Sequence, residues 1–331
     1  MSGLASDGQD RDVPRPPRLA LTAGDPAGIG LEIVLKALSS EGRPKADLSV
    51  YGPADALEER ARRFALAWPV AGVRIVDIGS AADVVLGRPS PGGGRAAAAA
   101  VLAAARDAMA GRVDALVTAP LNKESLAAAG HPWPGHTEML AEAAGCADVA
   151  MLFVGGGLRV ALVTIHRSLR SVPDAVRADE VQRVVRLVHR ELPALGAATR
   201  RIALCGLNPH AGEGGLFGRE EIDVLAPAVG RLRAEGIDVT GPLPADSLFV
   251  RASRGEFDAV VAQYHDQGLI PVKLVSFGQA VNVTLGLPFV RTSVDHGTGF
   301  DIVAGGTADA GSLLAAMQLA ATLVANRRRL G

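Results

Sequence analysis

Apolar runs and amphipathic stretches alternate along the chain from residue 19 to the C-terminus. Runs rich in Val, Ile, Leu and Ala predict strands over 19–22, 48–51, 73–78, 115–117, 201–205, 258–262, 280–284 and 289–293, and a hairpin over 151–154 and 158–165. The pattern also predicts helices over 29–39, 54–66, 122–129, 136–144, 180–192 and 311–329, and a long alanine helix after a Pro/Gly-rich loop at 89–94. Such alternation predicts an α/β fold with a mostly parallel sheet and helices on both faces.

The same pattern bears on domain organisation. No linker-like composition appears after residue 18, so we expect residues 18–325 to form one unit of two interleaved lobes around a central cleft. The boundary between the lobes stays open. Residues 1–17 lack an apolar stretch, which predicts a disordered tail rather than a signal peptide.

Composition narrows the classes of partner. The 331-residue chain carries a net charge of −1, so there is no global field to attract nucleic acid or an anionic membrane. Its alanine-rich stretches are too short to span a bilayer. The two cysteines, Cys146 and Cys205, have neither metal-ligand nor redox spacing, which predicts reduced thiols in a cytoplasmic protein.

Three histidines each stand just past the end of a predicted strand. They are His166, His210 and His265. An α/β enzyme places its chemistry at the carboxyl ends of its strands, so we expect the three to converge. Neutral imidazoles suit a catalytic divalent metal that keeps one position open for water or substrate. The alternative is three unrelated polar residues at strand ends.

Two glycine-rich segments have ambiguous meaning. Residues 24–30 follow the first strand with G-x-x-x-G-x-G spacing, which differs from the dinucleotide fingerprint and favours a tight turn. Asp25 is then a local cap or a pocket carboxylate. Residues 92–94 precede the alanine helix and offer N–H groups to a phosphate, but a flexible loop is the preferred interpretation.

Further polar residues indicate an anion site. His136 and Thr137 open a predicted helix, where donors suit an anionic group, although ordinary capping explains them as well. Lys273, Asn282 and Arg291 lie on or beside later predicted strands at spacings of nine. A lysine and an arginine at one sheet edge make a phosphate or carboxylate clamp, whereas solvated strand-end charges are the alternative. The loop 295–298 either contacts a nucleotide or is a simple turn.

The order of seven motifs is similar to that of the 4-hydroxythreonine-4-phosphate dehydrogenase family of pyridoxal phosphate biosynthesis. The motifs are GDPAGIG (24–30), TAPLNK (118–123), GHTE (135–138), GLNPHAGEGG (206–215), GPLPAD (241–246), YHDQG (264–268) and VNVTLGLPFVRTSVDHGTG (281–299). They extend over nearly all of residues 18–325. The resemblance implies an isopropylmalate-dehydrogenase-like fold. As activity it implies NAD- or NADP-dependent oxidation of 4-phosphooxy-L-threonine to a 3-oxo acid that decarboxylates to 3-amino-2-oxopropyl phosphate.

The resemblance also implies a homodimer whose active site takes residues from both subunits. By resemblance, a divalent metal (zinc, magnesium or cobalt) binds to His166, His210 and His265. The phosphorylated four-carbon substrate contacts His136, Thr137, Lys273, Asn282 and Arg291. The residues that resemble an adenine-side cofactor loop are Asp295, His296, Gly297 and Thr298. The catalytic candidates are His136, Asp246 and Lys273, and the choice of general base between His136 and Asp246 stays open.

Some departures resemble a second branch of the same family. Asp25, the run IPVK (270–273) and the stretch SLRSVPDAV (168–176) are similar to 4-phospho-D-threonate and 4-phospho-D-erythronate dehydrogenases. Those two compounds are therefore alternative substrates. A protein of another class, which binds metal or phosphate without catalysis, would take up ligand but produce no NADH.

Overall fold

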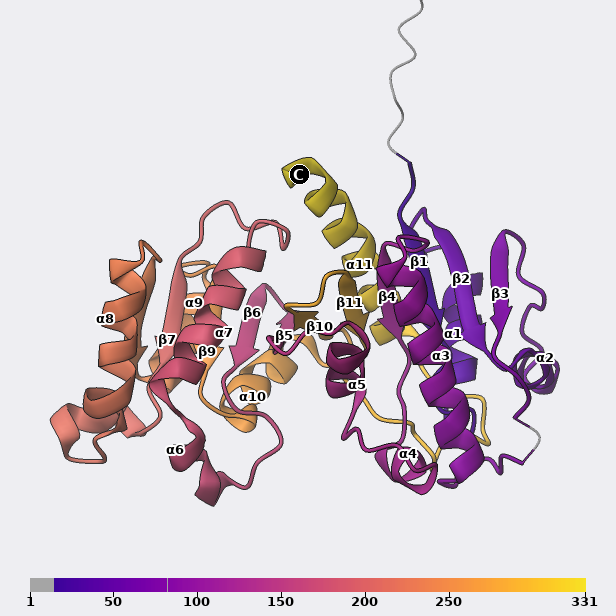
Figure 1. Ribbon diagram of the computed structural model, residues 1–331, viewed down its shortest axis with the longest axis horizontal. Helices are drawn as coiled ribbons and strands as arrows, with labels where there is room; N and C mark the ends of the chain where they lie inside the picture. Colours follow the sequence, from indigo (N-terminus) through magenta and orange to yellow (C-terminus); the bar gives the residue numbers. More distant parts are fainter. Residues whose placement is uncertain (1–14, 82) are drawn as a thin grey trace, which may run out of the picture.

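The computed structural model describes residues 15–81 and 83–331, and its centre is one eleven-stranded sheet (Figure 1). The strands lie in the order β3-β2-β1-β4-β11-β10-β5-β6-β9-β7-β8. Their bounds are β1 (Arg18–Thr22), β2 (Asp47–Gly52), β3 (Val73–Asp77), β4 (Ala115–Thr118), β5 (Ala150–Gly155), β6 (Leu158–Leu162), β7 (Ile202–Cys205), β8 (Val239–Leu243), β9 (Ala259–Ala262), β10 (Val281–Leu285) and β11 (Val290–Ser293). The predicted α/β fold with a mostly parallel sheet is confirmed.

The strands change direction in the middle of the sheet. The pairs β11–β10, β10–β5 and β5–β6 are antiparallel, and the pairs on either side are parallel. We call β3-β2-β1-β4-β11 the first half of the sheet and β6-β9-β7-β8 the second half. The carboxyl ends of the two halves therefore point to opposite edges, with β10 and β5 between them.

Helices cover both faces of this sheet. They are α1 (Gly30–Ser39), α2 (Ala54–Arg63), α3 (Pro91–Met109), α4 (Lys123–Ala128), α5 (His136–Ala143), α6 (Val172–Ala175), α7 (Ala178–Glu191), α8 (Ala226–Ala234), α9 (Ala245–Ser253), α10 (His265–Ser276) and α11 (Gly311–Leu330). Neighbouring residues of one strand point to opposite faces. On β4, Val117 packs in the core of α1, α7, α8 and α11, whereas Leu116 packs in the core of α3 and α5. In the second half of the sheet, one face of β6, β7 and β9 packs against α9 and α10.

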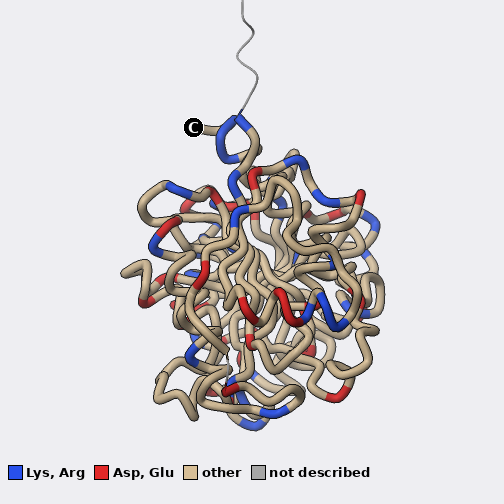
Figure 2. The backbone as a smooth tube through the Cα atoms, turned by 90° about the vertical axis from the view of Figure 1, so that its right-hand side faces the viewer, with Lys and Arg blue, Asp and Glu red and all other residues tan. Residues whose placement is uncertain are grey.

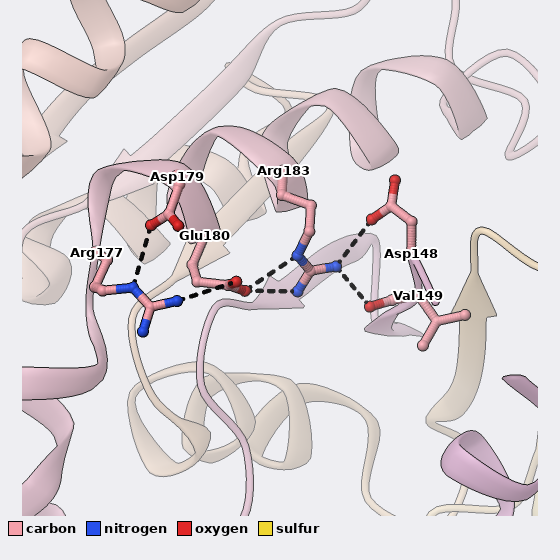
Figure 3. A network of polar contacts seen from close by, with 6 residues as sticks. All are labelled: Asp148, Val149, Arg177, Asp179, Glu180 and Arg183. Carbon is pink, nitrogen blue, oxygen red and sulfur yellow. Dashed lines mark hydrogen bonds and ion pairs between the residues drawn. The ribbon is translucent and has the colours of Figure 1, made fainter. Parts of the chain in front are cut away.

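Helix α7 shows how sequence periodicity becomes packing. Its apolar stripe (Val181, Val184, Val185, Leu187 and Val188) is buried against the sheet, as the 3.6-residue period predicts. Its exposed side carries ion pairs that reach the chain before β5 (Figure 3). Arg183 donates to Oε2 of Glu180 at 3.0 Å, to Oδ1 of Asp148 at 3.1 Å and to the carbonyl of Val149 at 2.8 Å. These bonds fasten α7 to the connection between α5 and β5.

Two expectations about local structure are wrong, and one part of the fold was not predicted. Residues 92–94 are not a flexible loop, because α3 begins at Pro91 and its first turn packs closely. A Cβ at Gly94 would lie 2.0 Å from the carbonyl oxygen of Ser125. The loop expected at 264–268 is wrong, because α10 begins at His265 and extends to Ser276 with Pro271 inside it. The strand β8, with helices α8 and α9, was not expected, because its sequence Val-Thr-Gly-Pro-Leu lacks an apolar run.

The expected disordered tail, residues 1–17, falls mostly outside the described residues. In its last three residues, the carbonyls of Arg15 and Pro17 accept hydrogen bonds from Arg328 and from the backbone N–H of Asp47. Basic and acidic residues are interspersed along the chain (Figure 2). No helix in the described part is both long and apolar enough to cross a membrane.

Candidate active site

Arg291 of β11 is a buried cation, with 2% of its surface exposed. Its Nη1 donates to Oγ1 of Thr284 at 2.9 Å and its Nη2 to Oγ1 of Thr118 at 2.8 Å. Its Nε has no partner among the described residues. Burial lowers the pKa of Arg291 to about 10, so the guanidinium is still charged at neutral pH. Within the described chain this charge is bonded to neutral hydroxyls alone, and it lacks a bonded counter-ion.

The sheet itself fixes the orientation of this guanidinium. Thr118 ends β4 and Thr284 lies on β10, which are the two neighbours of β11. The hydroxyl of Thr118 donates to Oγ of Ser293 at 2.9 Å, and Ser293 donates back to the carbonyl of Thr118 at 2.9 Å. Three adjacent strands therefore hold Arg291 before any ligand binds.

Among the buried polar atoms of the described chain that have no hydrogen-bond partner, two more belong to expected substrate contacts. They are Nε2 of His136, at the start of α5, and Oδ1 of Asn282, two residues before Thr284 on β10. Burial and the positive charge of Arg291 hold the pKa of His136 well below its usual range, so its imidazole is neutral. Buried polar atoms in native proteins are nearly always hydrogen-bonded. Together with Nε of Arg291, these atoms mark a place for a polar ligand.

The depressed pKa of His136 has a consequence for stability. The unfolded chain binds a proton at this histidine near pH 6.5, whereas the folded chain binds it only at lower pH. The contribution of His136 to the free energy of unfolding is therefore fully present above about pH 6.5 and is lost as the pH falls below that value. We expect the free energy of unfolding to fall more steeply between about pH 7 and 5 in the wild type than in His136→Gln, by up to about 1.4 kcal/mol per pH unit. Urea denaturation across this range measures both slopes, and parallel slopes would contradict the expectation.

His166 and His265 meet beside the second half of the sheet. Their ring centroids lie 6.1 Å apart, and both line a pocket of about 290 Å³ together with Tyr264 and Asp266. Nδ1 of His265 lies 2.8 Å from Oδ1 of Asp266. Burial lowers the pKa of His166, and the charges of Lys123 and His265 lower it further. The pair therefore offers two imidazole ligands to a metal, and the lowered pKa of His166 favours the neutral form of that ring.

In a single chain His210 lines a different pocket from His166 and His265, although both pockets are lined by Tyr264 and Asp266. It is exposed and lines another pocket, of about 710 Å³, which also contains Asp246 and Asp266. Among the described residues, no three His, Cys, Asp or Glu side chains are grouped so that they could hold a metal ion. One chain thus brings together two of the three expected ligands, and the full triad stays a prediction.

The backbone around His210 has an unusual conformation. His210, Ala211 and Glu213 have φ values of 51°, 52° and 43°, and the glycines between and after them are also left-handed. Left-handed geometry costs a non-glycine residue about 1–2 kcal/mol. The buried carboxylate of Glu221 compensates by accepting from the backbone N–H groups of Leu207 and Asn208, both at 2.7 Å. Strain held in this way is typical of functional loops.

The expected cofactor loop, residues 295–298, follows β11 and packs against the glycine-rich segment 24–30, here called the first glycine motif. Thr298 is buried, and its carbonyl accepts a bond of 2.9 Å from the N–H of Ile29. A Cβ at Gly28 would lie 2.6 Å from the Thr298 carbonyl oxygen, and Gly24 has a φ of +73°. The tight-turn interpretation of residues 24–30 is therefore confirmed. Contact of Asp295, His296, Gly297 and Thr298 with a nucleotide stays a prediction.

The remaining expected residues lie on helices. Thr137 is buried in the first turn of α5. Lys273 is half-buried in the third turn of α10, so its expected place on or beside a strand is wrong. Asp246 is exposed in the first turn of α9, where its Oδ1 accepts from the N–H of Ser247 at 2.8 Å. It shares the larger pocket with His210.

Sequence reasoning missed several residues of the site. Thr118 and Thr284 hold Arg291, and the charges of Lys123 and Glu138 act on His166. Glu138 also opposes the fall in the pKa of Arg291. Alternation along β10 could have identified Thr284, since it shares a face with Asn282. No pattern in the sequence indicates that Thr118 would contact Arg291.

Comparison with known proteins gives consistent matches over nearly the whole chain. The family model described as pyridoxal phosphate biosynthetic protein PdxA matches residues 34–320. The 4-hydroxythreonine-4-phosphate dehydrogenase of Chromobacterium violaceum is 46% identical, over 96% of this chain and 100% of that protein. A crystal structure of 4-hydroxythreonine-4-phosphate dehydrogenase from Klebsiella pneumoniae has a TM-score of 0.84 and 40% identity, over 93% of this chain and 99% of that one. A terephthalate 1,2-cis-dihydrodiol dehydrogenase from Burkholderia xenovorans LB400 has a TM-score of 0.65 and 37% identity, over 93% and 98% of the two chains.

Proposed function

The chain belongs to the pyridoxal phosphate biosynthetic protein PdxA family, and from this premise we propose that it oxidises 4-phosphooxy-L-threonine with NAD or NADP. The C3 hydroxyl loses its proton to a base and the C3 hydrogen leaves as hydride to the nicotinamide. The resulting 3-oxo acid breaks its C1–C2 bond and releases CO2; the electron pair of that bond stays as an enolate, which takes up a proton at C2 and gives 3-amino-2-oxopropyl phosphate. The buried charge of Arg291, which lacks a bonded counter-ion in the described chain, carries the proposal.

An anionic substrate supplies what Arg291 lacks. A buried charge is costly unless an opposite charge and hydrogen bonds compensate it. A phosphate provides both, and a planar guanidinium binds its oxygens with defined geometry. The backbone N–H groups at the start of α5 add a favourable dipole. Lys273, Asn282, His136 and Thr137 complete the proposed substrate contacts.

His166 and His265 fit a divalent metal by their chemistry. Both are imidazoles, and burial favours the neutral form of His166 that a metal requires. Nitrogen ligands favour zinc or cobalt over magnesium. When bound, such an ion supplies Lewis-acid polarisation of substrate oxygens. We propose that His210 completes the ligand set from a second copy of the chain.

Proton transfer falls to side chains of this chain. His136 is neutral and has a free Nε2, so it is able to accept the hydroxyl proton. Asp246 and Lys273 are the other candidates. Asp295, His296, Gly297 and Thr298 are proposed to contact the adenine side of the cofactor.

A second copy of the chain is proposed to cover α10. Ile270 and Leu274 of α10 are 66% and 84% exposed, Val275 is 48% exposed, and Phe277, just after the helix, is 85% exposed. A group of apolar side chains this exposed is typical of a protein interface. Ile270, Leu274 and Val275 also line the pocket of His210 and Asp246. A homodimer would therefore bury this surface next to residues assigned to the site.

Substrate profiling tests the proposal directly. We expect NADH or NADPH formation with 4-phosphooxy-L-threonine in the presence of a divalent metal. Loss of the phosphate leaves Arg291 unpaired, so unphosphorylated 4-hydroxythreonine should react with kcat/KM lower by about a hundredfold or more. Absorbance of the reduced nicotinamide measures both rates. Preference for 4-phospho-D-threonate or 4-phospho-D-erythronate would assign the second branch, and inactivity with all four compounds would refute the dehydrogenase assignment.

A further inference from the structure

The segment 295–310, which follows β11 and is here called the 295–310 loop, is fastened to α1 at two places. Near its start, the carbonyl of Thr298 accepts from the N–H of Ile29, just before α1. Near its end, the ammonium of Lys36 donates to the carbonyls of Gly306 at 2.9 Å and Ala308 at 2.8 Å. The loop contains four glycines between residues 297 and 306, so its own sequence gives it little rigidity.

Lys36 is joined to a buried carboxylate on the same helix. Its Nζ donates to Oε1 of Glu32 at 2.7 Å, so each of the three N–H groups of the ammonium has one acceptor. The same oxygen of Glu32 accepts from the N–H of Ala308 at 2.9 Å. Glu32 is completely buried. The pair therefore holds both the N–H and the carbonyl of Ala308.

Helix α2 supports the same arrangement. A Cβ at Gly306, whose φ is +66°, would lie 2.6 Å from the ring of Phe64, so the loop packs directly on that ring. Arg60, which is 1% exposed, donates to the carbonyls of Pro26 and Gly28 at 3.0 Å each. These contacts lie on α1, α2 and the first glycine motif, outside the residues assigned to metal and phosphorylated substrate.

We propose that Glu32 and Lys36 are positioning residues for the nicotinamide cofactor, because they fix the 295–310 loop that carries Asp295 to Thr298. This inference rests on the proposed function, which assigns that loop to the cofactor. A loop held in its binding conformation loses less conformational entropy when the cofactor binds, so its affinity is higher. The pair touches no substrate, so its effect is confined to the cofactor.

The test is Lys36→Met, with Lys45→Met as the matched control because Lys45 is exposed. We expect Lys36→Met to raise the KM and the Kd of NAD or NADP by about tenfold or more, with the KM of the phosphorylated substrate and kcat changed by less than about twofold. Glu32→Gln keeps an oxygen for Lys36 and Ala308 and should show a smaller change in the same direction. Fluorescence titration measures the Kd without substrate. Hydrogen exchange of residues 298–308 should rise in Lys36→Met.

Several outcomes would overturn the proposal. One is an equal rise in the KM of substrate and of cofactor. Another is a lower Tm with an unchanged Kd for NAD and NADP, which would make the pair purely structural. If Lys36→Met does not fold, an unchanged cofactor Kd in folded Glu32→Gln decides against the proposal. Wild-type protein that binds neither NAD nor NADP also removes it, whereas wild-type protein that binds cofactor but oxidises none of the substrates refutes only the proposed function.

Discussion

Arg291→Met is expected to lower kcat/KM for the phosphorylated substrate by about a thousandfold while the protein stays folded. The substrate anion loses a charged, pre-oriented partner in a site shielded from water. The free protein loses a buried cation that has no counter-ion bonded to it, so the free energy of unfolding should be unchanged or higher. Steady-state kinetics and urea denaturation on the same preparation measure the two quantities.

Arg159→Met is the matched control for this experiment. The guanidinium of Arg159, on β6, donates to the carbonyls of Asp258 and Leu195 and has no assigned functional role. Its loss leaves those acceptors unpaired, so the protein should lose about 1–3 kcal/mol of stability and keep its kcat/KM. Arg291 would instead have a structural role if Arg291→Met were less stable than Arg159→Met and kept the kcat/KM of the wild type.

Leu274→Asp is expected to separate the proposed dimer and to lower activity by a hundredfold or more, as an order-of-magnitude estimate. Leu274 is 84% exposed in one chain, and a carboxylate at the centre of an apolar interface is unfavourable because it would be buried without a partner. Light scattering measures the molecular mass in solution, and steady-state kinetics measure the loss of activity. Leu330→Asp, at an exposed leucine on α11, is the control and should change neither.

A mixing experiment distinguishes a site built from two subunits from a dimer in which each site lies within one subunit. His166→Ala and His210→Ala should each be inactive alone. If one site takes His166 from one copy and His210 from the other, a mixed dimer has one intact site, and random mixing restores about a quarter of the wild-type activity. Mixtures that stay inactive after subunit exchange would place both histidines in the same copy.

The sequence predicted the sheet well and its irregular parts poorly. Strands such as β7 and β9 are buried on both faces, so they appear as continuous apolar runs. Helix α10 was missed because Pro271 and Gly268 are typical of breaks, whereas packing of Gly268 against Leu162 and Val160 requires a residue without a side chain. Tertiary contacts of this kind leave no local signal.

The candidate site was also predicted in part. Sequence placed three histidines after strands, and β6, β9 and β7, which they follow, are indeed neighbours. It gave no sign that the left-handed turn at His210 would take that side chain to a different pocket, because backbone dihedrals of non-glycine residues cannot be read from composition. Glu32 and Lys36 have ordinary helical i,i+4 spacing, so their link to residues 306–308 was equally hidden.

The path of the chain through the sheet constrains how the protein assembles on the ribosome. The second half of the sheet is continuous in sequence from β6 to β9, whereas the first half receives β11 and α11 from the last residues. Arg291 and the 295–310 loop belong to that late segment. The second half can therefore begin to fold during synthesis, while the first half must wait, with one edge of β4 unpaired, until translation is nearly finished.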